Sequence, residues 1–231
     1  MMKDEFTFKQ FTIKQNRCAM KVGTDGVLLG AWAKGGRRIL DIGTGTGLIA
    51  LIMAQRFPKA IVESIDIEEN ACEQAEENFL NSPFSDRLQV FHTPLQKFQP
   101  ELQYDAIVCN PPYFVNSLKT PDTKRAIARH TDALSFNNLF HHSKRLLKPE
   151  GELSIIIPVE NLEDILAESY FSGFFTKKKI WVKTTRDKRE KRLLLAFSKR
   201  NTETEELHVS LLEEHNIKSE WYKKLTDDFY L

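Results

Sequence analysis

The chain has 231 residues, of which 41% are hydrophobic, and its formal net charge is +1. This length accommodates one sizeable domain with short extensions but leaves little room for a second full domain, and the near-neutral charge excludes a protein that is basic overall. No apolar run approaches membrane-spanning length and no secretory signal is expected, so we predict a cytoplasmic protein without a membrane segment.

Apolar runs and amphipathic stretches alternate along most of the chain. Strands are predicted at residues 38–42, 61–66, 88–92, 104–109, 152–158, 176–183 and 192–198. Helices are predicted at residues 27–32, 48–56, 68–81, 135–147 and 160–172. This alternation predicts the α/β class: a Rossmann-like αβα sandwich with a seven-stranded, mostly parallel sheet and an antiparallel last hairpin. We expect one domain, with residues 1–35 as an N-terminal extension, 36–200 as the core and 201–231 as a C-terminal extension.

A glycine-rich loop follows the first predicted core strand. Asp41 is followed by Gly43, Gly45 and Gly47, and a predicted helix starts directly after them. Glycines adopt positive φ readily and let a ligand approach the backbone closely. A dinucleotide-binding loop would need a small residue where Leu48 stands, which argues against an NAD-dependent oxidoreductase. The pattern Asp-x-Gly-x-Gly-x-Gly is instead similar to motif I of S-adenosylmethionine (SAM) methyltransferases, in which the loop holds the amino-acid end of the cofactor.

Asp66 ends the next predicted strand. Its carboxylate can accept hydrogen bonds from both hydroxyls of a ribose. It could also cap the helix predicted to begin near Glu68. Its position one strand and one helix after the glycine loop favours ribose binding.

The sequence Asn110-Pro111-Pro112-Tyr113 directly follows a predicted buried strand. Asn110 offers a side-chain carbonyl and the two prolines have no N–H, so the backbone presents acceptors rather than donors. Acceptors that converge on an exocyclic amino group turn its lone pair towards an electrophile, and Tyr113 adds a ring for stacking. The motif therefore predicts chemistry on the amino group of a base or an amide, although a proline-rich turn has the same composition.

The cysteines and histidines predict no metal site. Cys18, Cys72 and Cys109 form no CxxC pair, which argues against zinc and against a disulfide framework. His141 and His142 lie on a predicted helix without a nucleophile at a recognisable spacing, and we expect them to be surface residues.

With these motifs, the chain resembles the tRNA1(Val) (adenine(37)-N6)-methyltransferases over nearly its whole length. The matching segments are residues 6–11, 16–32, 40–47, 110–113, 193–198 and 222–231. The glycine loop and the Asn-Pro-Pro-Tyr motif identify amino-methyltransferases in general. The Lys-Val-Gly-Thr-Asp-Gly run that starts at Lys21 and the Phe-Tyr-Leu ending are more selective.

The resemblance implies methylation of N6 on the adenine that follows the anticodon of tRNA, with SAM as the donor. Asn110 and the Pro111 carbonyl would orient the adenine amine, and Tyr113 would stack on the flipped base. Residues implied to bind SAM are Lys21, Gly23, Thr24, Asp41, Gly43, Gly45, Gly47, Asp66 and Asn110. Among these, Lys21, Gly23 and Thr24, together with Asp25, look like an N-terminal lid over the methionine end of SAM, although a tight turn before a helix would have the same sequence.

One position departs from related enzymes, which commonly place an acid after the third strand to contact the cofactor adenine. Here residues 91–95 supply none. His92, Gln96 or backbone groups are the candidates for that contact.

Basic residues concentrate in one segment. Eleven Lys or Arg residues stand between positions 177 and 200, against two acids. The residues predicted to contact RNA phosphates are Lys183, Arg186, Lys188 and Arg189, with Arg125 and Arg129 from a polar segment, 116–131, expected to form a mobile loop. A solvated, lysine-rich turn is the alternative.

Other functions share parts of the pattern. Asn-Pro-Pro-Tyr also serves enzymes that act on ribosomal RNA or DNA amines or on protein glutamine amides, although a DNA-modifying enzyme would be expected to have a separate target-recognition domain. A non-catalytic RNA-binding module gives no reason for Asn110 and the glycine loop to occur together. We expect a monomer that needs no metal.

Overall fold

The computed structural model describes residues 4–18, 21–112, 134–214 and 217–231. Its centre is an eight-stranded sheet with the order β10-β8-β9-β7-β6-β3-β4-β5. The strands are β3 (Arg38–Ile42), β4 (Ile61–Asp66), β5 (Leu88–His92), β6 (Tyr104–Cys109), β7 (Leu147–Pro158), β8 (Phe175–Thr185), β9 (Glu190–Ser198) and β10 (Glu205–Leu212). Only β9 runs antiparallel to its sheet neighbours, β7 and β8.

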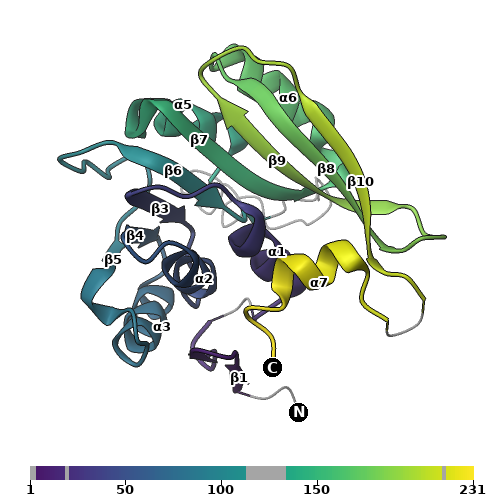
Figure 1. Ribbon diagram of the computed structural model, residues 1–231. Helices are drawn as coiled ribbons and strands as arrows, with labels where there is room; N and C mark the ends of the chain where they lie inside the picture. The colour runs from purple at the N-terminus through teal and green to yellow at the C-terminus, as the bar shows by residue number, and fades with distance from the viewer. Residues whose placement is uncertain (1–3, 19–20, 113–133, 215–216) are drawn as a thin grey trace, which may run out of the picture.

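Helices cover both faces of the sheet (Figure 1). One face is covered by α1 (Thr24–Trp32), α2 (Leu48–Arg56), α3 (Glu69–Leu80) and α7 (Glu220–Thr226). The other face is covered by α5 (Phe136–Leu146) and α6 (Leu162–Phe171), which follows the short 3-10 helix η2 (Val159–Asn161). A second 3-10 helix, η1 (Ser85–Arg87), leads into β5. Together these layers form the predicted αβα sandwich.

The structure has two hydrophobic cores, one on each face of the sheet, because successive side chains along a strand point to opposite faces. In β3, Ile39 packs with the helices of the first face, whereas Leu40 and Ile42 pack with those of the second. Parallel strands covered on both faces are rich in buried, mostly apolar residues, which is why the sequence predicts the central strands β3, β4 and β6 with the observed bounds.

The α/β class and the antiparallel hairpin are confirmed, and the sheet has one strand more than the predicted seven. The additional strand, β10, pairs parallel with β8 at the sheet edge. Its sequence, Glu205–Leu212, is mostly exposed and has no apolar run of the kind that marks the central strands. An edge strand needs no such run because only one of its sides is paired. Helix α1 also starts three residues before the predicted position 27.

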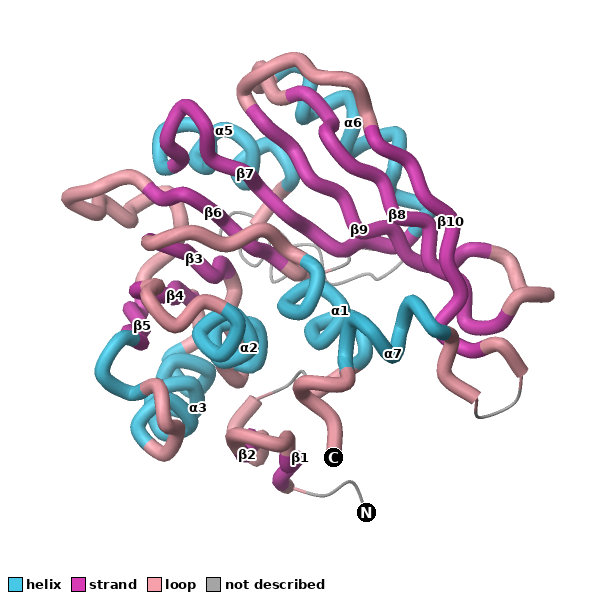
Figure 2. Tube along the Cα trace, in the orientation of Figure 1, coloured by secondary structure: helices cyan, strands magenta, loops and turns pink. Residues whose placement is uncertain are grey.

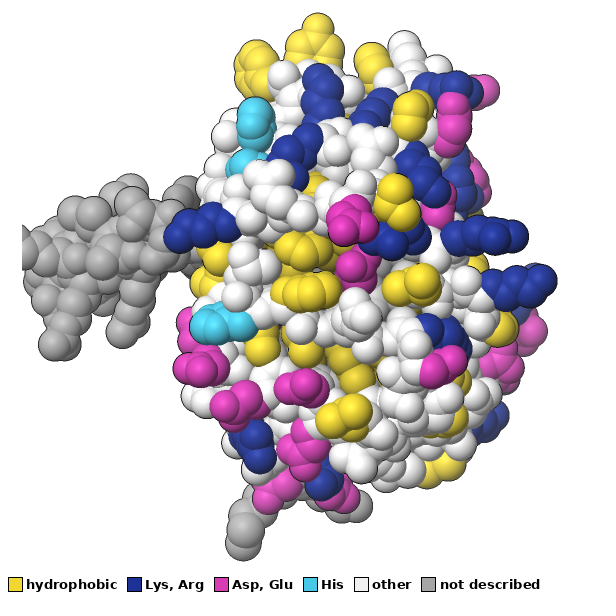
Figure 3. Space-filling view, turned by 90° about the vertical axis from the view of Figure 1, so that its left-hand side faces the viewer, with side chains coloured by type: hydrophobic (Ala, Val, Ile, Leu, Met, Phe, Trp, Pro, Cys, Tyr) yellow, Lys and Arg dark blue, Asp and Glu magenta, His cyan; other side chains and the backbone are white. Residues whose placement is uncertain are grey.

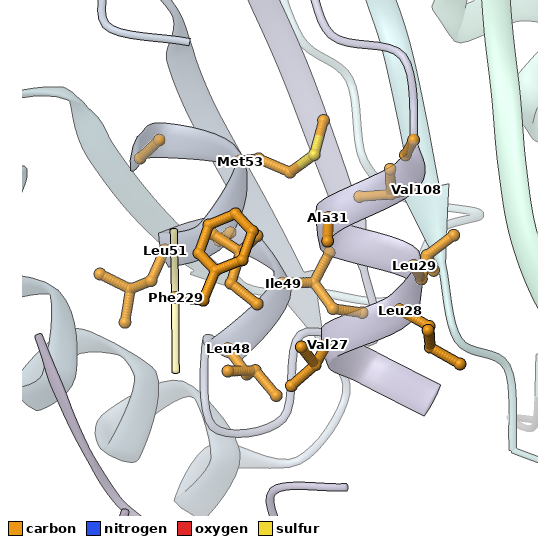
Figure 4. Packing of buried hydrophobic residues seen from close by; sticks show 14 of the residues in the cluster. Val27, Leu28, Leu29, Ala31, Leu48, Ile49, Leu51, Met53, Val108 and Phe229 are labelled. Carbon is orange, nitrogen blue, oxygen red and sulfur yellow. The ribbon is translucent and has the colours of Figure 1, made fainter. Parts of the chain in front are cut away.

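The two ends of the chain meet on the first face of the sheet (Figure 2). The N-terminal strands β1 (Glu5–Thr7) and β2 (Thr12–Lys14) form a separate antiparallel pair. Beside it, the Lys9 amide donates to the Phe229 carbonyl at 2.8 Å. Phe229 is buried among side chains of α1 and α2, as Figure 4 shows. Both extensions therefore contribute to the same hydrophobic core as the helices of the central part.

No helix in the described part of the chain has the length and apolar character to cross a membrane. The same described residues contain no cluster of three or more His, Cys, Asp or Glu side chains suited to a metal ion.

Candidate active site

Three strands end side by side at the carboxyl edge of the sheet. Ile42, the last residue of β3, pairs with Cys109 of β6 on one side and with Ile65 of β4 on the other. The residues that follow these strands are therefore neighbours, because adjacent strands are about 4.8 Å apart. Asn110, Gly43 and Asp66 thus lie close together, as the sequence predicts for residues at the ends of parallel strands.

The glycine loop uses the left-handed backbone region at all three predicted glycines. Gly43, Gly45 and Gly47 have φ of 71°, 54° and 81°. A Cβ added at Gly43 or Gly45 would meet nothing within 4 Å, whereas at Gly47 it would lie 2.5 Å from the Phe79 ring. The first two glycines therefore border open space that a ligand can enter. The third is needed for close packing of the loop against α3.

The Asp66 carboxylate holds the glycine loop in place. One of its oxygens accepts from the Gly45 amide at 2.9 Å, and the other accepts from the Glu68 amide at 3.0 Å. Asp66 thus bonds to the backbone just before α3 and to the glycine loop, and ribose binding by Asp66 stays a prediction. Each carboxylate oxygen has a second lone pair, which leaves capacity for a ligand hydroxyl.

Asp41 lies beneath the loop and is fully buried. Its Oδ2 accepts from the Thr44 hydroxyl at 2.7 Å, and its Oδ1 has no hydrogen-bond partner among the described residues. Burial raises the pKa of Asp41 to about 7, the Thr44 hydrogen bond lowers it, and the charge of Asp66 raises it further. Burial thus makes ionisation of Asp41 unfavourable, and a positive charge placed near the loop would favour the ionised form.

The Asn-Pro-Pro-Tyr motif is placed in part. Asn110 is half-buried, Pro111 is buried and Pro112 is exposed, all directly after β6. Tyr113, Arg125 and Arg129 lie outside the described residues. Burial and the charges of Asp41 and Asp66 raise the pKa of the Cys109 thiol, which suits an inert small residue at the end of the strand.

The predicted N-terminal lid lies near Asp66 and is anchored to the sheet. Burial and the charge of Asp66 raise the pKa of the Cys18 thiol to about 11, and Lys21 lowers it, so these three side chains are within electrostatic range of one another. Gly23 precedes α1 in extended conformation, and Thr24, which is exposed, begins the helix.

An ion pair links the lid residues to a distant strand. Asp25, in the first turn of α1, accepts from Arg192 of β9 at 2.7 Å, and both side chains are about one-quarter to one-third exposed. This pair holds the start of α1 at the carboxyl edge of the sheet, because Arg192 is paired with Pro158 at the end of β7.

The predicted RNA-binding turn lies at that same edge. The connection from β8 to β9 carries Arg186, Lys188 and Arg189, all exposed, while Lys183 is half-buried at the end of β8. Arg186 also pairs with Glu213. β8 is three strands from β6, which separates the two strands by roughly 15 Å across the sheet. The pairing of Cys109 with Ile155, of Ile155 with Leu195 and of Leu195 with Lys179 also puts Asn110 level with Ile180, so the turn lies roughly 20 Å farther along the strands.

His92 and Gln96, the side chains predicted to contact the cofactor adenine, lie at and after the end of β5: His92 is the last residue of that strand, and Gln96 comes four residues later. His92 pairs with Asp66 in the sheet, and its Nε2 lies 3.0 Å from the Ile67 carbonyl. Ile67 is 44% exposed directly after Asp66, so it offers apolar surface beside the carboxylate. Gln96 is half-buried, and among the residues that the structure describes no hydrogen bond links its side chain to this edge.

Sequence reasoning missed two buried polar residues that hold the N-terminal segment against α3. Gln74 and Asn78 on α3 are buried and bind the backbone of the N-terminal segment. Their spacing of four residues, beside the apolar stripe of a predicted helix, is the signal that could have identified them. The ion pair of Asp25 with Arg192 had no such local signal.

Comparison with known proteins gives relatives along the whole chain. Residues 22–184 match the family model of the methyltransferase small domain. The chain is 47% identical to the tRNA1(Val) (adenine(37)-N6)-methyltransferase of Parabacteroides distasonis, covering 98% of this chain and 97% of that protein. A protein with the same name from Tolumonas auensis is 43% identical over 98% of this chain and 96% of its own length.

Solved structures agree on the fold. A predicted O-methyltransferase from Agrobacterium tumefaciens superimposes with a TM-score of 0.71 at 18% identity, covering 89% of this chain and 96% of that one. A glycopeptide N-methyltransferase crystallised with SAM has a TM-score of 0.55 at 11% identity, covering 77% of this chain and 99% of that one.

The described residues fit SAM. The cofactor carries a sulfonium and an ammonium group, and the loop region combines open space at two glycines with the buried Asp41 and the neighbouring Asp66. Two carboxyl groups are complementary in charge to the sulfonium and ammonium groups, which together outweigh the single carboxylate of the cofactor. Asp41 Oδ1, which has no hydrogen-bond partner among the described residues, leaves negative charge that a nearby cation would stabilise.

Substitutions at the glycines can distinguish a loss of stability caused by backbone strain from a loss of SAM affinity caused by a methyl group in the binding space. Gly43→Ala should cost about 1–2 kcal/mol of stability, from the left-handed backbone alone, and weaken SAM binding at least tenfold because the new methyl group enters the open space. Gly47→Ala should cost more stability, since its Cβ also meets Phe79. Denaturant unfolding and calorimetric titration with SAM would measure both effects.

Gly173 is the matched control, because it has φ of 75° and its Cβ would meet only the flexible end of Lys144. Gly173→Ala should lose stability without a change in SAM affinity. Equal SAM affinity in the Gly43 and Gly173 variants would contradict the assignment of the open side of the loop.

Asp41 makes stability depend on pH. Its folded pKa of about 7 lies above its ordinary value of 3.8, so ionisation opposes folding increasingly as pH rises from about 4 to 7 and the penalty is complete above that range. Asp41→Asn removes the penalty while keeping an acceptor for Thr44. Its stability relative to the wild type should therefore rise by up to about 3 kcal/mol between pH 5 and pH 8, measured by denaturant unfolding without SAM. Parallel pH profiles for the two proteins would refute the assigned shift.

Proposed function

The chain belongs to the methyltransferase small domain family and, within it, to the tRNA1(Val) (adenine(37)-N6)-methyltransferases, and we propose that it transfers the methyl group of SAM to N6 of adenine 37 in tRNA1(Val). The observation that carries the proposal is the position of Asn110 beside Gly43 at the ends of paired strands. This arrangement places an amino-group acceptor next to a loop suited to SAM. We further propose that the enzyme acts as a monomer in the cytoplasm.

Asn110 and Pro111 would orient the target amine. SAM, when bound, supplies an electrophilic methyl group, so the protein needs no covalent intermediate. Acceptance of the N6 hydrogens by Asn110 Oδ1 and by the Pro111 carbonyl would hold the amine and direct its lone pair towards the methyl group. Fixing the two reactants in line accounts for much of the rate, because the orientation is achieved on binding.

The adenine must leave the anticodon-loop stack to reach Asn110. Such unstacking costs a few kcal/mol, and an aromatic side chain on the flipped base offsets part of the cost. Tyr113 is the residue we assign to this contact, from its place in the motif.

The cofactor would lie along the glycine loop. Gly43 and Gly45 would border the amino-acid end of the cofactor, and Gly47 would let the loop pack closely against Phe79 of α3. The Asp66 carboxylate, which also accepts from the Gly45 amide, would accept from the ribose hydroxyls. Asp41 supplies negative charge from below. The N-terminal residues Lys21, Gly23 and Thr24 would cover the methionine end, held near it by the pair of Asp25 with Arg192.

The distribution of charge favours an approach of RNA from the turn between β8 and β9. Figure 3 faces the side opposite to that turn, and on this side Asp and Glu side chains gather in the lower part. Helix α3, in the lower part of the molecule, carries Glu69, Glu73, Glu76 and Glu77. RNA phosphates are repelled there and attracted to Lys183, Arg186, Lys188 and Arg189 at the carboxyl edge, with Arg125 and Arg129 as further proposed contacts.

Removal of the Asn110 carboxamide should reduce methyl transfer far more than SAM binding, which should weaken by no more than about tenfold through loss of the implied contact of Asn110 with the cofactor. The assay uses labelled SAM and total tRNA from cells that lack this modification, followed by nuclease digestion and nucleoside mass analysis. N6-methyladenosine should form with the wild type and fall at least a hundredfold with Asn110→Ala. Asn81→Ala is the control, because Asn81 is exposed at the far end of α3 and its side chain donates to the Glu77 carbonyl of the same helix.

Two outcomes separate the parts of the proposal. Labelling of ribosomal RNA, DNA or protein glutamine with no labelling of tRNA would retain the chemistry and overturn the substrate. Full activity of Asn110→Ala would overturn the assigned role of the motif.

The basic turn should govern the salt dependence of tRNA binding. Replacement of both Lys188 and Arg189 by alanine should weaken tRNA binding about tenfold and reduce the slope of log K against log salt by about 1–2, since two phosphate contacts are lost. SAM affinity should stay unchanged. The control replaces Lys223 and Lys224, exposed on α7, in the same way. An identical salt slope for wild type and turn variant would show a merely solvated turn.

A further inference from the structure

Helix α3 binds the N-terminal segment through side chains that pair with its backbone. We call residues 12–18, which comprise β2 and the residues that follow it, the N-terminal strap. The Arg17 amide donates to Gln74 Oε1 at 3.1 Å. Lys14 and Arg17 also form ion pairs with Glu77 on the exposed side of the helix. The strap is thus held along one face of α3.

Asn78 binds the strap and the glycine loop at the same time. Its Oδ1 accepts from the Lys14 amide at 2.9 Å, and its Nδ2 donates to the Lys14 carbonyl at 2.9 Å. The second hydrogen of Nδ2 goes to the carbonyl of Thr46 at 2.8 Å. Thr46 stands between Gly45 and Gly47, so a single carboxamide joins two segments that are 32 residues apart in the sequence.

The bridge is buried and permits little adjustment. Asn78 is 1% exposed, and its amide uses both donors and its acceptor in these three bonds. Next to it, Phe79 packs under Gly47. A shift of the loop at Thr46 must therefore break a buried hydrogen bond or move the strap, and a buried group left without its partner is costly.

The strap in turn positions the residues that lead into α1. Gln15, which is also buried, accepts from the Val22 amide through its side chain at 2.8 Å. Val22 directly precedes Gly23, one of the residues assigned to the methionine end of SAM. Hydrogen bonds of Asn78 and Gln15, joined by the backbone between Lys14 and Gln15, thus connect the glycine loop through the strap to the start of the N-terminal lid.

We propose that Asn78 is a positioning residue that couples the SAM-binding conformation of the glycine loop to the placement of the N-terminal strap. The inference rests on the proposed function, because it assumes that SAM lies along this loop. Asn78 itself contacts neither reactant. It fixes the Thr46 carbonyl, and with it the direction in which the neighbouring glycines face the cofactor, and it transmits ordering of the loop to Lys14 and onwards to Val22.

Gln74 provides a matched control. It is buried on the same helix face one turn earlier and binds the strap, but its hydrogen bonds go to Arg17 and Glu77 and not to the loop. A purely structural role of strap packing predicts similar effects of Gln74→Ala and Asn78→Ala. Coupling through the loop predicts that only Asn78→Ala changes cofactor binding.

The first measurement is steady-state methyl transfer to tRNA together with calorimetric SAM titration. Asn78→Ala should raise the KM and the Kd for SAM at least tenfold and keep kcat within about threefold, whereas Gln74→Ala should leave all three within about threefold. Partial unfolding of a variant would lower its apparent kcat without raising its KM, so this effect can be distinguished from weaker SAM binding. An unchanged KM in Asn78→Ala, or an equal rise in both variants, would overturn the proposal.

The second measurement uses the wild-type protein and needs no variant to fold. Amide hydrogen exchange of Gln15 and Val22, which neither replacement contacts directly, should slow at least fivefold when SAM is added. Exchange rates unaffected by SAM would overturn the coupling. In Asn78→Ala the slowing should disappear, and in Gln74→Ala it should persist.

The titration also separates this inference from the function on which it rests. A wild-type protein that does not bind SAM would remove the proposed function. A wild type that binds SAM, with an Asn78 variant that binds it equally well, would remove the coupling alone.

Discussion

The parallel pairing of β3 with β4 on one side and with β6 on the other determines where every residue of the candidate site lies. Three chain segments separated by dozens of residues end at one edge because their strands are in register. Binding sites in open α/β sheets form at this edge, outside the carboxyl ends of the strands. The local interactions of Asp66 with Gly45 and of Asn78 with Thr46 then fix the loop that the sheet has placed there.

The central part of the fold follows from local patterns in the sequence. The central strands β3, β4 and β6 have the predicted bounds because buried parallel strands are short, mostly apolar runs between polar turns. The glycine loop and Asp66 were predictable for a related reason, since their role depends on a backbone conformation and a strand end that the sequence marks directly.

Long-range contacts were beyond the reach of the same reasoning. The partners of Asn78 are backbone carbonyl and amide groups, which every residue carries, so nothing in the sequence points to Lys14 or Thr46. The eighth strand escaped prediction because an edge strand has little buried surface to leave a pattern. The ion pair of Asp25 with Arg192 was equally unpredictable, because the two residues come together only once the sheet is complete.

The meeting of the two chain ends has a consequence for how this protein is made. Lys9 bonds to the carbonyl of Asp227 across 218 residues, and Phe229 fills a place between α1 and α2, more than 170 residues earlier in the chain. Synthesis proceeds from the N-terminus, and contacts of such separation form late because a long loop must close first. A nascent chain that does not yet include Phe229 therefore has α2 incompletely covered, and the core between α1 and α2 closes only once this residue can fold back onto it.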